Sequence, residues 1–104
     1  NICQEWDSTT VGIAECAMRE MSWWDARLNK DYATLKAGLA PDVFASLRDA
    51  QRAWIAYREA NCRYQYDLWG GGTIRQIVGA GCWLDMTAQR AIEIAGDVET
   101  MGEF

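Results

Sequence analysis

Four cysteines are the most reactive side chains in this sequence. They are Cys3, Cys16, Cys62 and Cys82. An even number of cysteines in a chain of 104 residues is typical of disulfide bonds formed in an oxidising compartment. No two of them form a Cys-x-x-Cys pair and the chain has no histidine, so the ligand spacing of a structural zinc site is missing. The sequence therefore favours disulfides over free buried thiols, and it predicts no metal site and no cofactor.

The pairing of these cysteines is open, because four cysteines allow three connectivities. We favour local pairing, Cys3–Cys16 and Cys62–Cys82. The first bond would fasten the N-terminal arm to the start of the first helix, and the second would clamp both sides of the glycine run at residues 70–72. Each closed loop would contribute about 3 kcal/mol, which is large for a domain of this size.

The absence of histidine also limits catalysis, since it removes the commonest general base and the usual third member of nucleophilic triads. Two carboxylates suffice for glycosidic bond hydrolysis. However, no spacing among the 15 acidic residues singles out a pair. We therefore expect no catalytic residues and no enzymatic activity.

Chain length and charge limit the number of domains and the kinds of partner that this protein can have. A chain of 104 residues predicts a single domain over residues 1–104. The formal net charge of −5 would repel a phosphate backbone, so nucleic acid is not an expected partner. No apolar run approaches the roughly 18 residues of a transmembrane helix. The chain begins at Asn1, which we interpret as a mature chain whose signal peptide has been removed.

Apolar residues recur at steps of three and four along three segments, the pattern of amphipathic helices. The first segment follows potential helix-capping residues at 7–10, and its apolar residues continue to Leu39. The second segment extends from about Pro41 to Asp67. Three consecutive glycines at 70–72 then predict a turn, because their entropic cost inside a helix is too high.

The third segment is weakened by Gly79 and Gly81, so we expect a short helix leading into a longer one near Cys82. The sequence thus predicts an all-α fold. Its architecture is a small antiparallel bundle of three long helices, the third broken near Gly79 to Gly81, stapled by two disulfides.

Polar side chains interrupt the apolar stripes of the first two helices. Because these helices are antiparallel, we expect Asp25 to face Arg58 across their interface, since a buried guanidinium needs such a partner. We interpret the network as a layer that fixes helix register in preference to a ligand site. Its members are Asp25, Asn29, Tyr32, Gln51, Trp54 and Arg58, with Thr87 and Arg90 joining from the third segment.

Six tryptophans are many for this length. Trp24 and Trp54 lie on the apolar stripes and are expected in the core. Trp23, Trp69 and Trp83 fall off the stripes or beside the turn, where exposed rings would suit sugar stacking or a protein partner. Burial against neighbouring loops is the favoured interpretation.

Two runs resemble motifs of the lysozyme inhibitor LprI-like domain family. Residues 25–32 match D-x-x-L-N-x-x-Y, and residues 47–62 match the longer motif L-x-x-A-Q-R-x-W-x-x-[FY]-R-x-x-x-C. The polar network above coincides with these motifs. Further matches in the family's order are Gly71-Gly72-Thr73, Cys82 and Thr87-x-x-Arg90, with Cys3 and Cys16 as the N-terminal cysteines.

This resemblance implies an exported bacterial envelope protein, secreted, periplasmic or lipid-anchored, and the leading hypothesis is that it inhibits lysozyme by protein-protein binding. An acidic chain would be steered toward a strongly basic lysozyme. We expect the partner contact at Trp69, Gly70, Gly71, Gly72 and Thr73, because a glycine-rich loop fixed by a disulfide enters a sugar-binding cleft at little ordering cost. The alternative is a non-inhibitory envelope module that binds another protein or a cell-wall glycan through exposed tryptophans.

Overall fold

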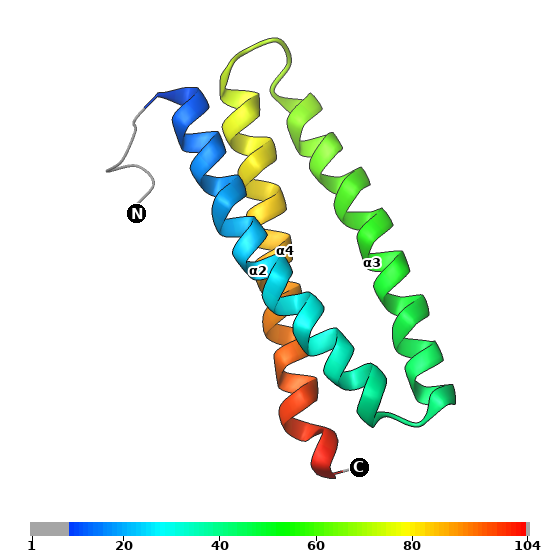
Figure 1. The fold of residues 1–104 in the computed structure, drawn as a ribbon. Helices are drawn as coiled ribbons and strands as arrows, with labels where there is room; N and C mark the ends of the chain where they lie inside the picture. Colours follow the sequence, from blue (N-terminus) through cyan, green and yellow to red (C-terminus); the bar gives the residue numbers. More distant parts are fainter. Residues whose placement is uncertain (1–8, 104) are drawn as a thin grey trace.

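The fold is an antiparallel arrangement of three long helices, described by a computed structural model for residues 9–103. The helices are α2 (Thr10–Gly38), α3 (Pro41–Leu68) and α4 (Ile74–Thr100), followed by the 3₁₀ turn η1 (Met101–Glu103). Each helix runs opposite to the one before it (Figure 1). The predicted all-α class with three long helices is confirmed.

Local sequence signals set the helix ends. The side chain of Thr9 caps α2 by accepting a hydrogen bond from the backbone N–H of Gly12 at 3.0 Å, as N-cap residues do. Pro41 begins α3, where its fixed φ suits the first helical position. After α3 the chain turns at Gly70, whose φ of 59° is a conformation that glycine adopts without steric cost.

The expected break in the third helix was wrong, since α4 is continuous from Ile74 to Thr100. Packing explains why glycine is tolerated at position 79. A Cβ at Gly79 would lie 3.2 Å from Cδ2 of Tyr66, so the missing side chain allows the Tyr66 ring to approach α4 closely. Tertiary contact of this kind outweighs the cost of about 1 kcal/mol that glycine carries in a helix interior.

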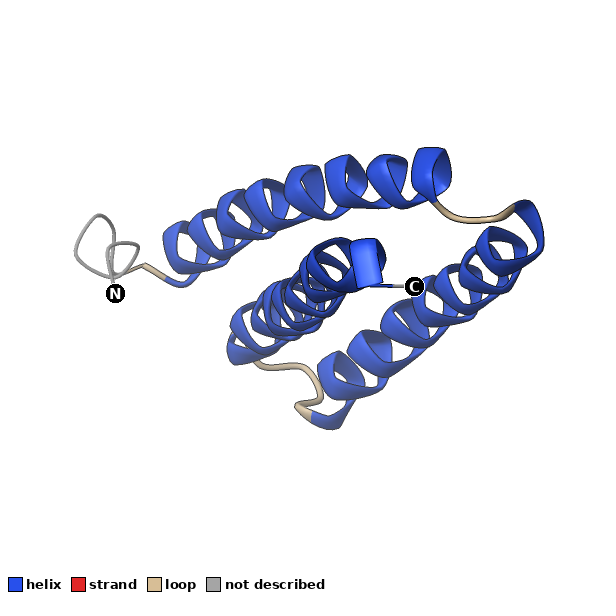
Figure 2. Cartoon of the chain, turned by 90° about the horizontal axis from the view of Figure 1, so that it is seen from below, coloured by secondary structure: helices blue, strands red, loops and turns tan. Residues whose placement is uncertain are grey.

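The apolar core lies between α2 and α4. Leu28 and Leu35 of α2 pack against Ala91 and Ile94 of α4, and all four side chains are almost fully buried. Helix α3 packs against α4 as well, but α2 and α3 scarcely touch each other. Viewed from below, α4 lies between the other two helices (Figure 2).

The molecule is therefore open and elongated. Its Cα radius of gyration is 16.0 Å and its principal extents are 47 × 27 × 15 Å, whereas a compact domain of this length has a radius of about 13 Å. No helix within residues 9–103 combines the length and apolar character needed to cross a bilayer.

One predicted disulfide joins α3 to α4. Cys62 and Cys82 are bonded, with Cα atoms 5.5 Å apart. The other predicted bond, Cys3–Cys16, involves Cys3, which lies outside the described residues. Cys16 is 8% exposed, and no described cysteine is free.

Candidate functional site

The polar layer joins α3 to α4, whereas the sequence placed it between the first and second helices. Nη1 of Arg58 donates to Oγ1 of Thr87 at 3.1 Å, and Nε of Arg90 donates to Oε1 of Gln51 at 2.9 Å. Gln51, Arg58 and Thr87 are buried. The residues expected only to join the network, Thr87 and Arg90, are thus its hydrogen-bond partners from α4.

Arg58 is held by aromatic rings in place of a direct ion pair. Its guanidinium carbon lies 4.7 Å from the ring centroid of Trp54 and 4.2 Å from that of Trp83, distances at which cation-π attraction is effective. Burial lowers the pKa of Arg58 below its usual value, while the charges of Asp25 and Glu59 oppose that shift. The buried Nε has no hydrogen-bond partner among the described residues.

Asp25 therefore acts on Arg58 only at long range, and the predicted contact across an α2–α3 interface was wrong. The physical reason is that the two helices scarcely meet. Asp25 instead accepts a hydrogen bond from Nδ2 of Asn29 at 3.4 Å, within α2. Tyr32 meets the ring of Phe44 edge-on, with centroids 5.3 Å apart.

The tryptophans divide as follows. Trp24 and Trp54 pack against the apolar core, as the stripes indicated. Trp83 is half-buried and stacks on Arg58. Trp23 and Trp69 are largely exposed, at 60% and 53%, so the favoured interpretation that loops bury them was wrong.

The loop between α3 and α4 is braced at its base. The Arg75 guanidinium donates to the carbonyl oxygen of Gly70 at 2.8 Å and stacks on the Tyr66 ring at 4.7 Å. The Cys62–Cys82 disulfide ties the two helices together below the loop. Trp69 therefore projects from a short, anchored segment.

A groove beside this loop was missed by sequence reasoning. Its volume is about 1050 Å³, and it lies between the first half of α2 and the last half of α3, over the start of α4. Val11 and Met18 form part of its α2 wall and are 56% and 37% exposed. Trp83 and Ala80 line it from α4, and charged residues of α2 and α3 line it too.

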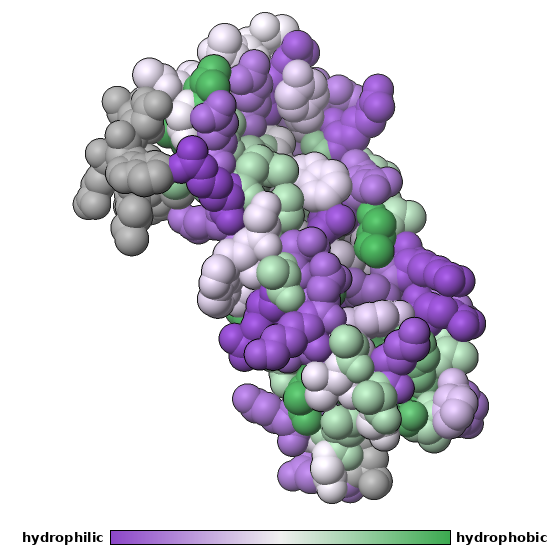
Figure 3. Space-filling model, in the orientation of Figure 1, coloured by the Kyte–Doolittle hydropathy of each residue, from purple (hydrophilic) through white to green (hydrophobic). Residues whose placement is uncertain are grey.

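A signal for this groove was present in the sequence. Val11 and Met18 are seven residues apart and so share one helix face, but neither belongs to the stripe that packs on α4. On the face of the molecule drawn in Figure 3, hydrophilic residues predominate and apolar residues form separate patches between them. No group of three or more His, Cys, Asp or Glu residues among the described residues is arranged to hold a metal ion.

Comparison with known proteins agrees with these motifs. The family model for lysozyme inhibitor LprI matches residues 3–94. The chain belongs to the lysozyme inhibitor LprI family. The match includes the polar layer, the disulfide and the braced loop.

A similar protein from another organism adds little about activity. An uncharacterized protein of Rhizobium meliloti (strain 1021) is 30% identical over 92 residues, which cover 76% of this chain and 66% of the relative. The alignment thus spans just under two thirds of that relative's length. No solved structure matches the chain.

Proposed function

We propose that this LprI family member inhibits lysozyme by binding the enzyme through the end of the bundle that carries the Trp69–Thr73 loop. Family membership is the observation that carries this proposal. The braced loop supports its location, because a segment that is ordered before binding loses little conformational entropy when a partner docks.

Trp69 is the expected anchor of the interface. It is 53% exposed, and tryptophan is enriched among residues that dominate binding energy. The adjacent groove would receive whatever part of the partner lies beside the loop. Its Val11 and Met18 side chains offer exposed apolar surface there.

Charge supports the pairing with a basic enzyme. The net charge of −5 would raise the rate of encounter with a positively charged lysozyme, an effect that salt screens. The Cys62–Cys82 disulfide is typical of proteins in oxidising compartments. We therefore place the protein in the periplasm or outside the cell.

The test is the rate at which a basic lysozyme lyses cell-wall substrate in the presence of stoichiometric protein. The proposal predicts slower lysis that recovers as salt rises. Trp69→Ala should abolish most of the effect, while Trp23→Ala, which removes a similarly exposed ring from α2, should leave it intact. Unchanged lysis with the intact protein would overturn the proposal. Co-sedimentation with purified peptidoglycan, combined with no effect on a soluble substrate, would point instead to a glycan-binding module.

A further inference from the structure

A second pocket lies at the other end of the gap between α2 and α3. Its volume is about 350 Å³, and it is lined by three basic residues, Lys36 of α2 and Arg48 and Arg52 of α3, with no acidic residue among its described lining. The whole chain has ten basic and 15 acidic residues. Such a concentration of positive charge in an acidic protein makes this pocket electrostatically distinct.

The three cations are poorly neutralised by the protein itself. Lys36 and Arg52 form no ion pair with any residue in 9–103. Arg48 pairs with its neighbour Asp49, with 3.5 Å between Nε and Oδ1 and with both side chains substantially exposed. The Arg48 Nε is nevertheless buried and has no hydrogen-bond acceptor in that part of the chain. These groups can therefore donate to a bound anion.

Gln51 adds a neutral donor to the pocket. Its side chain is 7% exposed and lines the pocket wall. Oε1 accepts the hydrogen bond from Arg90, which leaves the amide Nε2 without an acceptor in the described structure. Because Gln51 lines the pocket, this amide can donate to a ligand there.

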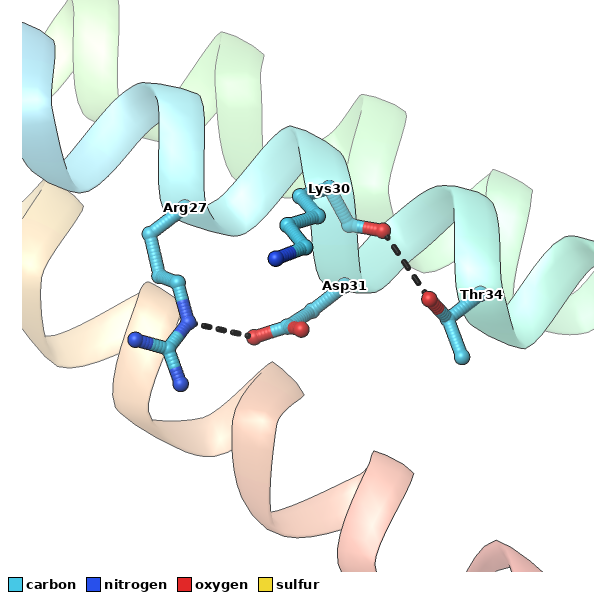
Figure 4. Close-up of polar contacts among 4 residues, drawn as sticks. All are labelled: Arg27, Lys30, Asp31 and Thr34. Carbon is cyan, nitrogen blue, oxygen red and sulfur yellow. Dashed lines mark hydrogen bonds and ion pairs between the residues drawn. The ribbon is translucent and has the colours of Figure 1, made fainter.

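Acidic groups on the neighbouring elements are engaged elsewhere. Asp31 of α2 lies on the side facing α4 and accepts from Nε of Arg27 at 3.3 Å (Figure 4). Asp25 accepts from Asn29, and on α4 Glu93 pairs with Arg90 at 3.3 Å.

We propose that this pocket binds a phosphate group, either a small phosphate monoester or the headgroup of an anionic lipid. Arginine donors match phosphate oxygens in a bidentate geometry, and the Gln51 amide would supply a further hydrogen bond. A volume of about 350 Å³ lies near the lower end of the range for ligand pockets, about 300 to 1,000 Å³. This inference is independent of lysozyme binding.

The first experiment titrates the protein with inorganic phosphate at low salt and follows backbone amide shifts by NMR. We expect saturable shifts at residues around Gln51 and Arg52. The pair Arg48→Gln and Arg52→Gln should weaken binding by roughly tenfold or more, because charge-assisted hydrogen bonds are lost. The control pair Arg27→Gln and Arg63→Gln removes the same charge at exposed positions outside this pocket.

A second variant tests the Gln51 donor directly. Gln51→Glu keeps an acceptor for Arg90 but replaces the free amide donor by a carboxylate, and it should also weaken phosphate binding by roughly tenfold or more. Equal weakening by the control pair, or unsaturated shifts spread over the whole surface, would overturn the proposal.

The source of the phosphate is decided by two further ligands. Vesicles containing phosphatidic acid are compared with vesicles of phosphatidylcholine alone, and a soluble phosphate monoester is titrated in parallel. Retention on the acidic vesicles that depends on Arg48 and Arg52 would support a lipid headgroup. Saturable binding of the monoester alone would support a soluble ligand. Binding of neither would contradict the proposal.

Discussion

The two helix interfaces of this protein are built from different chemistry. The α2–α4 interface is apolar and contains the fully buried core residues, with Leu35 at 1% and Ile94 at 0% exposure. The α3–α4 interface is held by a disulfide, by the Arg58–Thr87 hydrogen bond and by tryptophan rings on the guanidinium. Helix α3 adds Leu47 and Trp54 only at the edge of the apolar core, and both pockets open along the gap that it leaves beside α2.

This difference suggests a division of roles. Apolar burial is the dominant stabilising contribution in folding, so α2 and α4 should supply most of the stability. Directional contacts fix geometry, so those on α3 should decide where the loop and the pocket walls lie. Each variant below is designed to perturb one interface and leave the other unchanged.

The largest effect is expected in the apolar interface. Ile94→Ala should lower the free energy of unfolding by about 2–5 kcal/mol, the range for emptying a buried aliphatic site. Ile92→Ala, two residues away on the same helix but 60% exposed, should change it by less than about 0.5 kcal/mol. Urea denaturation measures both. Similar losses for the two variants would refute the assigned core.

Removing the disulfide tests the attachment of α3. The double variant Cys62→Ser with Cys82→Ser should lose about 3 kcal/mol, because the unfolded chain regains the entropy of an open loop of 20 residues. Amide hydrogen exchange should accelerate chiefly in the second half of α3. Acceleration of equal size around Leu28 and Leu35 would contradict the separation of the two interfaces.

The polar layer is tested by a substitution that keeps shape. Thr87→Val removes Oγ1, which accepts the hydrogen bond of the buried Arg58 guanidinium at 3.1 Å, and should cost about 1–3 kcal/mol. Thr34→Val removes an exposed hydroxyl that bonds the Lys30 carbonyl (Figure 4) and should have little effect. Thermal or urea unfolding of the two proteins gives the comparison, and equal stability would show that the layer contributes nothing.

The smallest expected change in stability comes from replacing two glycines of α4 by alanine. At Gly81 a Cβ would meet nothing within 4 Å, so Gly81→Ala should stabilise the protein by about 0.5–1 kcal/mol through helix propensity. At Gly79 the Cβ would lie 3.2 Å from the Tyr66 ring, and the gain should be cancelled or reversed. Melting temperatures would rise for Gly81→Ala only; a matching rise for Gly79→Ala would contradict the packing of Tyr66 on α4.

Sequence patterns predicted the elements better than their contacts. Three antiparallel helices were predicted from apolar residues at steps of three and four, from the potential capping residues at 7–10 and from Pro41. The preference for pairing cysteines close in sequence predicted the Cys62–Cys82 bond. Periodicity assigns a residue to a face of its own helix but does not say which neighbour that face meets. For this reason Asp25 was paired with Arg58, although both Arg58 and Gln51 bond to α4.

The pockets could not be predicted for a related reason. They exist because α2 and α3 diverge, which depends on how each helix packs on α4. The prediction of a helix break at Gly79 and Gly81 was also wrong. At Gly79 the Tyr66 ring of α3 fills the space that a side chain would occupy. Burial was the favoured interpretation for Trp23 and Trp69 and was wrong, because falling off the apolar stripe of a helix does not say whether a loop covers the ring.

The most direct test of the proposed function is the affinity of a basic lysozyme for the intact protein and for the folded variant that lacks the Cys62–Cys82 bond. Calorimetric titration at low salt should give stoichiometric binding by the intact protein and at least roughly tenfold weaker binding by the variant, because its loop must be ordered on docking. Equal affinities would contradict a binding face organised by the attachment of α3 to α4.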